Sequence, residues 1–353
     1  MNILERIYLL GHRYRTSTDL KGQRRLPVPV ISIGNITTGG TGKTPAVIAL
    51  AMEARARGFR PCVLTRGYGG RLRGPLFVSE ENYARDVGDE PLLIASRLHD
   101  VPVVKCPDRY KGGMFALDNL DSLDDQKKID GLPDLFILDD GFQHRRLQRD
   151  MDVLLVSALE PFGRGRLLPA GRLREPLSGI GRADVIVITK TEATDPGAIE
   201  EIRKTIAAHN PGAPVFLSTH GPTGVLLGVS PHESASPRAD LALIDWLKGR
   251  RVFAFSAVAG PESFIETLRQ AGADVAGSRS YRDHHVFSHG DLRDIRAEAQ
   301  RAGAGWIMTT EKDIMRLRAL EGQMDNIGAL IVDFMVEKDF YDRVLDNPGR
   351  SDA

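Results

Sequence analysis

The stretch VPVISIGNITTGGTGKTPAVIALAMEARARG, residues 28–58, decides the fold. Its first part, VPVISIG (28–34), is a short β-branched run that ends in glycine, and it predicts a buried strand. A Gly/Thr loop follows, and PAVIALAMEARARG (45–58) then has apolar residues at helical spacing and a glycine stop. Strand, loop and helix in this order are the context that a Walker A phosphate loop requires.

The loop itself supplies the nucleotide-binding candidates Gly39, Gly40, Thr41, Gly42, Lys43 and Thr44. Backbone N–H groups of such a turn face an anion, while Lys43 can bridge the β- and γ-phosphates and the Thr44 hydroxyl can reach Mg²⁺. The strict Walker pattern has a glycine where this chain has Thr37. Thr38 stands where dimeric ATPases of the partition and arsenical-pump type carry their signature lysine, which disfavours that class. The loop therefore predicts a nucleoside triphosphate and Mg²⁺ as ligands.

Further apolar runs, such as DVIVITK (184–190), alternate with helical or loop segments. This alternation predicts an α/β fold, in which a P-loop NTPase-like three-layer domain with a mostly parallel sheet is joined by a β-stranded linker to a smaller α/β C-terminal domain. We place an N-terminal helix and basic segment at 1–25, the P-loop kinase domain at 26–215, and the linker and C-terminal domain at 216–345. Two polar excursions, 118–134 and 230–241, receive no role.

The composition excludes several classes of protein. Lys plus Arg equals Asp plus Glu at 47 each, so no global field gathers nucleic acid. With only Cys62 and Cys106, the chain has neither a disulfide framework nor a Cys-rich zinc site, and a reducing cytoplasm fits best. No apolar run approaches the roughly 18 residues that span a bilayer, and the N-terminus lacks a signal-peptide core. We expect a chain that is neither secreted nor transmembrane.

Residues 1–25 combine an apolar pattern with positive charge. Helical spacing is seen for Ile3, Leu4, Ile7, Tyr8 and Leu10, and the basic run that follows comprises His12, Arg13, Arg15, Lys21, Arg24 and Arg25. Two interpretations stay open from this segment alone. The helix either packs on the protein's own core or lies in a membrane interface as an amphipathic anchor.

Acidic residues follow two further predicted elements. LPDLFILDD (132–140) is an apolar strand closed by Asp139 and Asp140, the form of a Walker B element that holds the Mg²⁺ shell. GDEPLL (88–93) places Asp89 in the expected first turn of a helix, where a partner of the helix dipole is the structural alternative. Because phosphoryl transfer to a hydroxyl needs a carboxylate that accepts the proton, Asp89 is a candidate base.

RDHHVFS (282–288) contains adjacent histidines, which point in different directions on most backbones. The residues alone favour a surface pair here. Taken in chain order, however, the motifs SIGNITTGGTGKTP, LTRGYGG, VGDEPLLIA, ILDDGFQHRRLQRD, LLPAGRLREP, ITKTE, YRDHH and TTEKD resemble one family, the tetraacyldisaccharide 4'-kinases. The resemblance runs from the N-terminal helix to TTEKD near residue 313, which is nearly the whole chain.

The resemblance implies transfer of the γ-phosphoryl group of MgATP to the 4'-hydroxyl of tetraacyldisaccharide 1-phosphate, giving lipid IVA. It implies a monomer at the cytoplasmic face of the inner membrane, and it favours the membrane role of the N-terminal helix. Asp89 matches the family's base, His284 the histidine of its dyad, and Asp139, Asp140 and Glu175 the acidic residues around metal and nucleotide. The positions similar to the lipid headgroup site are Asn35, Thr37, Arg66, Tyr68, Arg109, Gln143, His144 and Arg174.

Two other functions are alternatives to this one. The first is a P-loop NTPase that acts as a switch for a partner, because Thr189, Lys190 and Glu192 of ITKTE resemble the guanine-binding TKxD of some GTPases. Glu192 in place of aspartate weakens that likeness. The second is a non-catalytic membrane-binding module, which leaves the whole phosphate-loop constellation unexplained.

Overall fold

The structure is a computed structural model that describes residues 2–120, 131–228, 241–320 and 324–346. The predicted strand, loop and helix around residue 40 are all present. β1 (Val30–Gly34) is buried along its whole length, and α2 (Lys43–Ala56) begins directly after the loop. Gly42 precedes the helix at φ +84°, a left-handed conformation that glycine adopts without strain.

One sheet forms the frame of the molecule, in the order β11-β10-β12-β13-β8-β7-β6-β1-β5-β2-β4-β3, with β9 beside β8. Its other strands are β2 (Pro61–Thr65), β3 (Leu76–Phe77), β4 (Val103–Lys105), β5 (Leu135–Asp139), β6 (Met151–Ser157), β7 (Val185–Thr189), β8 (Val215–Leu227), β9 (Leu241–Leu243), β10 (Arg251–Ser256), β11 (Asp274–Ser280), β12 (Trp306–Thr310) and β13 (Ile327–Val336). Most neighbouring strands are parallel, which confirms the predicted α/β fold class.

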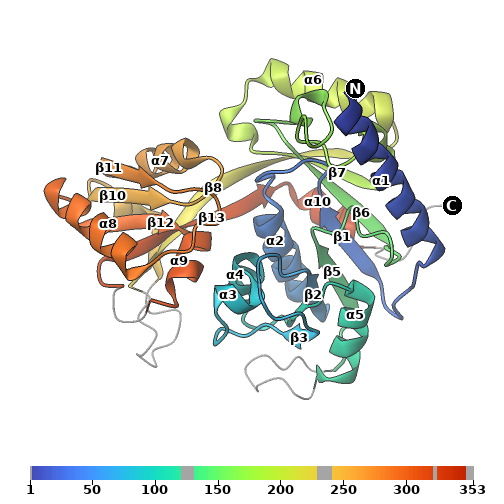
Figure 1. Cartoon of the computed structure of the whole chain (residues 1–353), viewed down its shortest axis with the longest axis horizontal. Coiled ribbons are helices and arrows are strands. Elements are labelled where there is room, and N and C mark those ends of the chain that lie inside the picture. The colour runs from blue at the N-terminus through green and yellow to red at the C-terminus, as the bar shows by residue number, and fades with distance from the viewer. Residues whose placement is uncertain (1, 121–130, 229–240, 321–323, 347–353) are drawn as a thin grey trace.

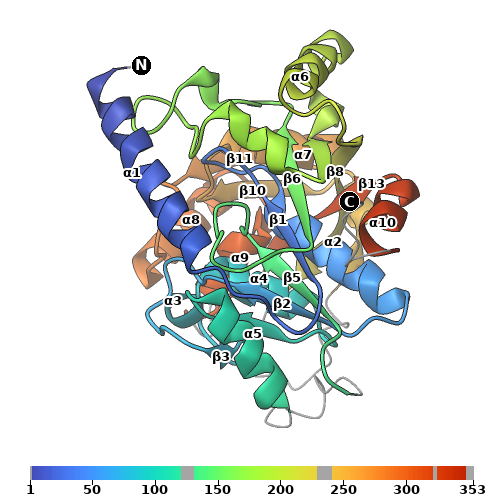
Figure 2. The same ribbon diagram turned by 90° about the vertical axis from the view of Figure 1, so that its right-hand side faces the viewer.

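Helices cover both faces of this sheet (Figures 1 and 2). They are α1 (Ile3–Lys21), α3 (Ala84–Val87), α4 (Asp89–Arg97), α5 (Arg109–Asp118), α6 (Pro196–His209), α7 (Pro261–Gln270), α8 (His289–Arg301), α9 (Glu311–Leu317) and α10 (Lys338–Leu345), with 3-10 turns at Gly163–Gly165, Leu177–Arg182, Thr191–Ala193 and Ile244–Leu247. Successive side chains of β6 alternate between the faces: Val153 packs in the cluster that contains α2, and Leu154 packs in the cluster that contains α6. Burial on both sides explains why the strands are apolar throughout.

Strands β8 and β13 connect the two lobes of Figure 1. The start of β8 pairs in parallel with β7, and Ser218–Leu227 then pairs antiparallel with β13. Because the sheet continues through β8, the division of the chain at 215 and 216 stays a prediction. The last described helix, α10, does not stay with the lobe that precedes it: Asp342 accepts a 2.6 Å hydrogen bond from Arg57, which caps α2.

Helix α1 lies on the outside of the first lobe (Figures 1 and 2). The side chain of Asn2 caps it and forms a capping box with Glu5. Glu5 and Asp19 are buried, while Ile3, Ile7, Leu10 and Tyr14 are between 61% and 78% exposed. Tyr8 belongs to the inner side, because its hydroxyl donates a 2.8 Å hydrogen bond to the Arg174 carbonyl oxygen. The helix is therefore docked on the protein, as the first interpretation expects, and it turns apolar side chains to solvent, so the membrane interpretation stays a prediction.

The two predicted excursions, 118–134 and 230–241, fall largely outside the described residues, at 121–130 and 229–240. In the part of the chain that the structure describes, no helix combines the length and the apolar character needed to cross a bilayer.

Candidate active site

The phosphate loop is anchored to strands on either side. Asn35 donates a 2.8 Å hydrogen bond to the Thr41 hydroxyl, and the Thr189 hydroxyl donates a 3.0 Å bond to the Thr41 carbonyl. Lys43 is the first residue of α2, and its Nζ lies 3.5 Å from Oδ1 of Asp140. Glycines at φ +118° (Gly39) and +84° (Gly42) leave the loop open for the close approach of a phosphate. The loop thus has the geometry and the charge that a triphosphate requires.

Asp139 and Asp140 stand at the end of β5, next to the loop. Asp139 accepts a 2.9 Å hydrogen bond from Thr65, and burial together with the charges of Glu90 and Asp140 raises its pKa to about 6. Burial alone would raise the pKa of Asp140, but the charges of Lys43 and Arg174 outweigh it and lower that pKa to about 2. The two neighbouring carboxylates therefore differ in proton affinity, and Asp139 holds its proton more tightly than Asp140.

A magnesium ion fits these residues by donor chemistry. Thr44, Asp139 and Asp140 offer the hard oxygen ligands that Mg²⁺ prefers, and this ion usually takes one or two carboxylates and completes its shell with phosphate oxygens and water. Accordingly, no group of three or more His, Cys, Asp or Glu side chains within the described ranges is arranged to hold a metal without such help.

Glu175, the fourth predicted metal residue, has other partners. Its carboxylate accepts hydrogen bonds of 2.6 and 3.2 Å from Arg182 and one of 2.8 Å from the Gln143 amide, and the residue is 1% exposed. Because both oxygens already face a guanidinium, this arrangement favours a role in positioning Gln143 over metal ligation. Gln143 in turn donates a 2.7 Å hydrogen bond to the Asn35 carbonyl, beside the phosphate loop.

Asp89 and His284 come together across the two lobes. Asp89 is the first residue of α4, as expected, and His284 Nδ1 lies 3.4 Å from its Oδ2. The hydrogen bond to Asp89 raises the pKa of His284. His284 is held at φ +59°, a conformation that is rare outside glycine and common at functional sites. Its ring is half-exposed and lies 6.2 Å from that of Tyr68, which is 73% exposed.

Of the remaining headgroup candidates, Arg174 contacts Asp140 directly. Arg174 donates two 2.9 Å contacts to the Asp140 carboxylate, and Thr37 bridges to the segment that carries Arg174. Arg109 and His144 are both largely buried, and Nε of Arg109 and Nε2 of His144 find no hydrogen-bond partner among the described residues. Burial and the charge of Arg109 lower the pKa of His144 to about 3. Buried donors without partners point to a polar ligand that completes them. Arg66, by contrast, is exposed.

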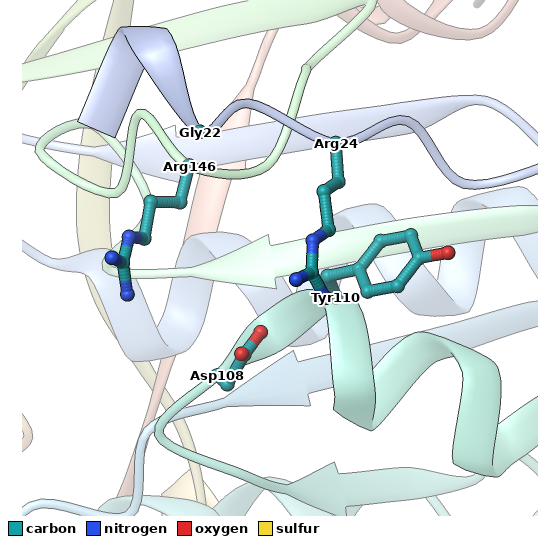
Figure 3. Close-up of a pocket in the computed structure, with 5 residues that line it drawn as sticks. All are labelled: Gly22, Arg24, Asp108, Tyr110 and Arg146. Atoms are coloured by element: carbon teal, nitrogen blue, oxygen red, sulfur yellow. The ribbon is translucent and has the colours of Figure 1, made fainter. Parts of the chain in front are cut away.

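A pocket lies beside this group, between the end of α1 and the start of α5 (Figure 3). Its lining consists of Gly22, Arg24, Asp108, Tyr110 and Arg146. The Arg24 guanidinium lies over the Tyr110 ring at 5.1 Å, and Arg146 is 3.1 Å from Asp19 on α1. The pocket thus lies next to Arg109 in sequence, because Asp108 and Tyr110 of its lining flank Arg109 at the start of α5.

Sequence reasoning missed two basic residues near the site, His220 and Arg316, and it considered Lys190 only as part of a guanine-binding motif. His220 on β8 fills the space beside Gly42, and burial and the charge of Lys190 lower its pKa to about 4. Lys190 itself lies against Gly40. Arg316 on α9 contacts Asp89, and the only signal for it was its position one helical turn after the Asp of TTEKD.

Comparisons with known proteins agree with this geometry. The model of the tetraacyldisaccharide-1-P 4'-kinase family, LpxK, matches residues 1–348. Proteins named tetraacyldisaccharide 4'-kinase from Anaeromyxobacter sp. strain K and Bradyrhizobium diazoefficiens are 40% and 38% identical over 84% and 89% of this chain, and 74% and 81% of their own length is matched. The crystal structure titled as the "apo" form of LpxK from Aquifex aeolicus in complex with ATP is 32% identical, with a TM-score of 0.71, and covers 97% of this chain and 96% of its own.

Proposed function

The chain belongs to the tetraacyldisaccharide 4'-kinase family, and from that premise we propose how its residues carry out the reaction. The protein is a kinase that uses ATP to phosphorylate the 4' position of a lipid A precursor. Membership of a kinase family removes the switch-type NTPase and the non-catalytic module from consideration.

We assign the nucleotide to the loop Gly39–Thr44. Lys43 binds the β- and γ-phosphates, and Thr44, Asp139 and Asp140 hold Mg²⁺, whose charge would offset that of the phosphate oxygens. The single observation that carries this assignment is the 3.5 Å contact of Lys43 with Asp140, because it brings the phosphate-binding cation and the metal-binding carboxylate to one point. Glu175 is left out of the metal set and orients Gln143.

Asp89 is the proposed base. It takes the proton of the 4'-hydroxyl while the 4'-oxygen forms a bond to the γ-phosphorus and the bond to the bridging oxygen of ADP breaks. His284 orients the Asp89 carboxylate from the second lobe. The proposed headgroup site consists of Asn35, Thr37, Arg66, Tyr68, Arg109, Gln143, His144 and Arg174. Its strongest support is the pair of unpartnered buried nitrogens on Arg109 and His144, which suit the phosphate and hydroxyl groups of a phosphorylated sugar.

The reaction is tested with purified protein in detergent micelles. We expect label from γ-³²P-ATP to appear in the tetraacyldisaccharide 1-phosphate, and EDTA to abolish the transfer, because neither the loop nor the two carboxylates neutralises the triphosphate without its metal. Transfer to water at the same rate without lipid would contradict the proposed acceptor site.

We further propose that α1 binds the surface of the inner membrane. Ile3, Ile7, Leu10 and Tyr14 recur at spacings of four, three and four residues and so share one stripe, on the side of the helix opposite to the docked Glu5 and Tyr8. A helix that buries carboxylates and exposes isoleucines is unfavourable in water alone, and an exposed apolar stripe of this kind marks a surface that binds a membrane or a partner. Arginines on the same helix suit anionic lipid headgroups. The requirement for ATP supports the cytoplasmic face, and a monomer stays the prediction.

The membrane role predicts a loss of vesicle binding in the triple variant Ile3→Ser/Ile7→Ser/Leu10→Ser. Each fully buried Ile or Leu contributes about 1.5–3 kcal/mol, so partitioning onto vesicles that contain phosphatidylglycerol should fall by about 10²-fold or more in a flotation assay. Leu241→Ser/Leu243→Ser serves as the matched control, because these leucines are equally exposed but lie on β9 in the other lobe. Equal loss in both variants would contradict the assignment to α1.

A further inference from the structure

The guanidinium of Arg316 sits at the meeting point of Asp89 and His284. Its Nε donates a 3.0 Å hydrogen bond to Oδ2 of Asp89, and its Nη2 makes a closer contact with the same oxygen. Nη2 also lies 3.1 Å from Nδ1 of His284. The Arg316 side chain is 8% exposed, so this contact is shielded from water and is not a loose surface ion pair. Any role given to Asp89 or His284 must therefore include Arg316.

The second lobe holds this guanidinium in place from behind. Nη1 donates 2.8 Å and 3.0 Å hydrogen bonds to Asp313 and to the carbonyl of Ala257. Asp313 is fully buried and accepts hydrogen bonds from the Ala257 amide and the Thr310 hydroxyl. Five donors in a planar fork allow one side chain to reach all these partners, which the single ammonium of a lysine cannot do. The fork is thus fixed on one side and presented to Asp89 on the other.

His284 has one ring nitrogen for two partners. Its Nδ1 is 3.4 Å from Asp89 and 3.1 Å from Arg316, and a single nitrogen either donates to the carboxylate or accepts from the guanidinium. While Arg316 donates to Nδ1, the ring is a neutral tautomer and Asp89 is paired with Arg316. While the ring donates to Asp89, Arg316 gives up its contact with Nδ1 and keeps its bonds to Asp89, Asp313 and the Ala257 carbonyl. The arrangement is a three-way junction and not a pair.

We propose that Arg316 is a positioning residue of the phosphoryl transfer, which orients the Asp89 carboxylate, keeps it charged in a buried place and decides which tautomer His284 adopts. This inference rests on the proposed role of Asp89 as the base. The groups that face Asp89 are Arg316, Lys312 and Asp313 of α9, His284 of the loop before α8, and Glu90 of its own helix. Arg316 is the cation that contacts the carboxylate directly from α9.

Removal of the Arg316 cation should change the pKa of Asp89 in a direction that can be measured. Burial alone would raise the pKa of Asp89, but the hydrogen bond to His284 and the charges of Arg316 and Lys312 outweigh it and hold that pKa well below its usual range. A base works only when ionised, so kcat/KM falls at the acidic side of the pH profile as the base takes up its proton. Without Arg316, that acidic limb moves to higher pH.

The experiment is the pH profile of kcat/KM for the lipid in wild type and in Arg316→Gln. We expect the acidic limb to shift upward by about 1–3 pH units in the glutamine variant, the range that an adjacent opposite charge produces. Arg316→Lys should shift the acidic limb less than Arg316→Gln does, because lysine keeps the positive charge but lacks the planar guanidinium. Arg97→Gln is the matched control, since it removes ion pairs of 2.7 and 2.5 Å between the same lobes without contacting Asp89, and its acidic limb should coincide with that of wild type.

Two results separate this inference from the function on which it rests. Full turnover in Asp89→Asn would remove the proposed base itself. Loss of turnover in Asp89→Asn together with a wild-type acidic limb in Arg316→Gln would leave the base standing and overturn the role of Arg316, and so would an equal shift in Arg97→Gln. Thermal melting of each variant shows whether it is folded. If the glutamine variant is unfolded, the pH profile of the lysine variant is compared with that of wild type instead.

Discussion

Asp89→Ala is expected to lower kcat by about 10²- to 10⁴-fold, the contribution of a positioned general base. Asp89 is 7% exposed and is held from the second lobe by His284 and Arg316, so water cannot readily take its place. The affinity for MgATP should be unchanged, because none of the hydrogen bonds of Asp89 involves the phosphate loop. The measurement is the steady-state rate of lipid phosphorylation, with calorimetric titration of the nucleotide alongside.

Asp86→Ala is the matched control for this prediction. Asp86 precedes Asp89 by three residues, and its carboxylate lies 3.8 Å from the Arg85 guanidinium. We expect near wild-type turnover in this variant. A rate in Asp89→Ala equal to that of the control would show that another group accepts the hydroxyl proton.

Lys43→Met should have an effect of similar size by a different route. Lys43 is the first residue of α2, and its side chain is 11% exposed. Its positive charge stabilises the negative charge that develops on the transferred phosphoryl group. Loss of one such preorganised charge lowers kcat by roughly 10²- to 10³-fold, and here MgATP binding should weaken as well. Rates and nucleotide titration together distinguish this variant from Asp89→Ala, which should keep its nucleotide.

Methionine keeps most of the length of Lys43, and Arg174 still pairs with Asp140 at 2.9 Å, so the fold should persist. Lys204→Met, on the exposed face of α6, is the control. Unchanged nucleotide affinity and rate in Lys43→Met would mean that the loop does not bind the triphosphate as proposed.

The parts of the structure that follow from local pattern were predicted from the sequence. The strand, loop and helix around Lys43, the strand that ends at Asp139 and the helix that begins at Asp89 are each encoded by a few consecutive residues. Apolar runs buried on both faces gave the α/β class for the same reason.

The features that could not be predicted from the sequence depend on contacts between distant segments of the chain. Arg316 and Asp89 are 227 positions apart, and no local pattern indicates that the two meet. Glu175 was grouped with the metal residues by resemblance, and only the structure shows that Arg182 and Gln143 both donate hydrogen bonds to its carboxylate. For α1 the spacing of Ile3 and Ile7 predicted an amphipathic helix, yet only the docking of Glu5 and Tyr8 decides which side faces outward.

The hydrogen bond from the Tyr8 hydroxyl to the Arg174 carbonyl oxygen connects α1 to the segment that carries Arg174. Tyr8 follows Ile7 of the exposed stripe, and the side chain of Arg174 holds Asp140, so the backbone of Arg174 links the proposed lipid-binding helix to the proposed site. If α1 adsorbs to the membrane as proposed, we expect the enzyme to search by lateral diffusion, in two dimensions. Its turnover then follows the mole fraction of glycolipid in the surface, and dilution with inert detergent slows it even when the bulk concentration stays constant.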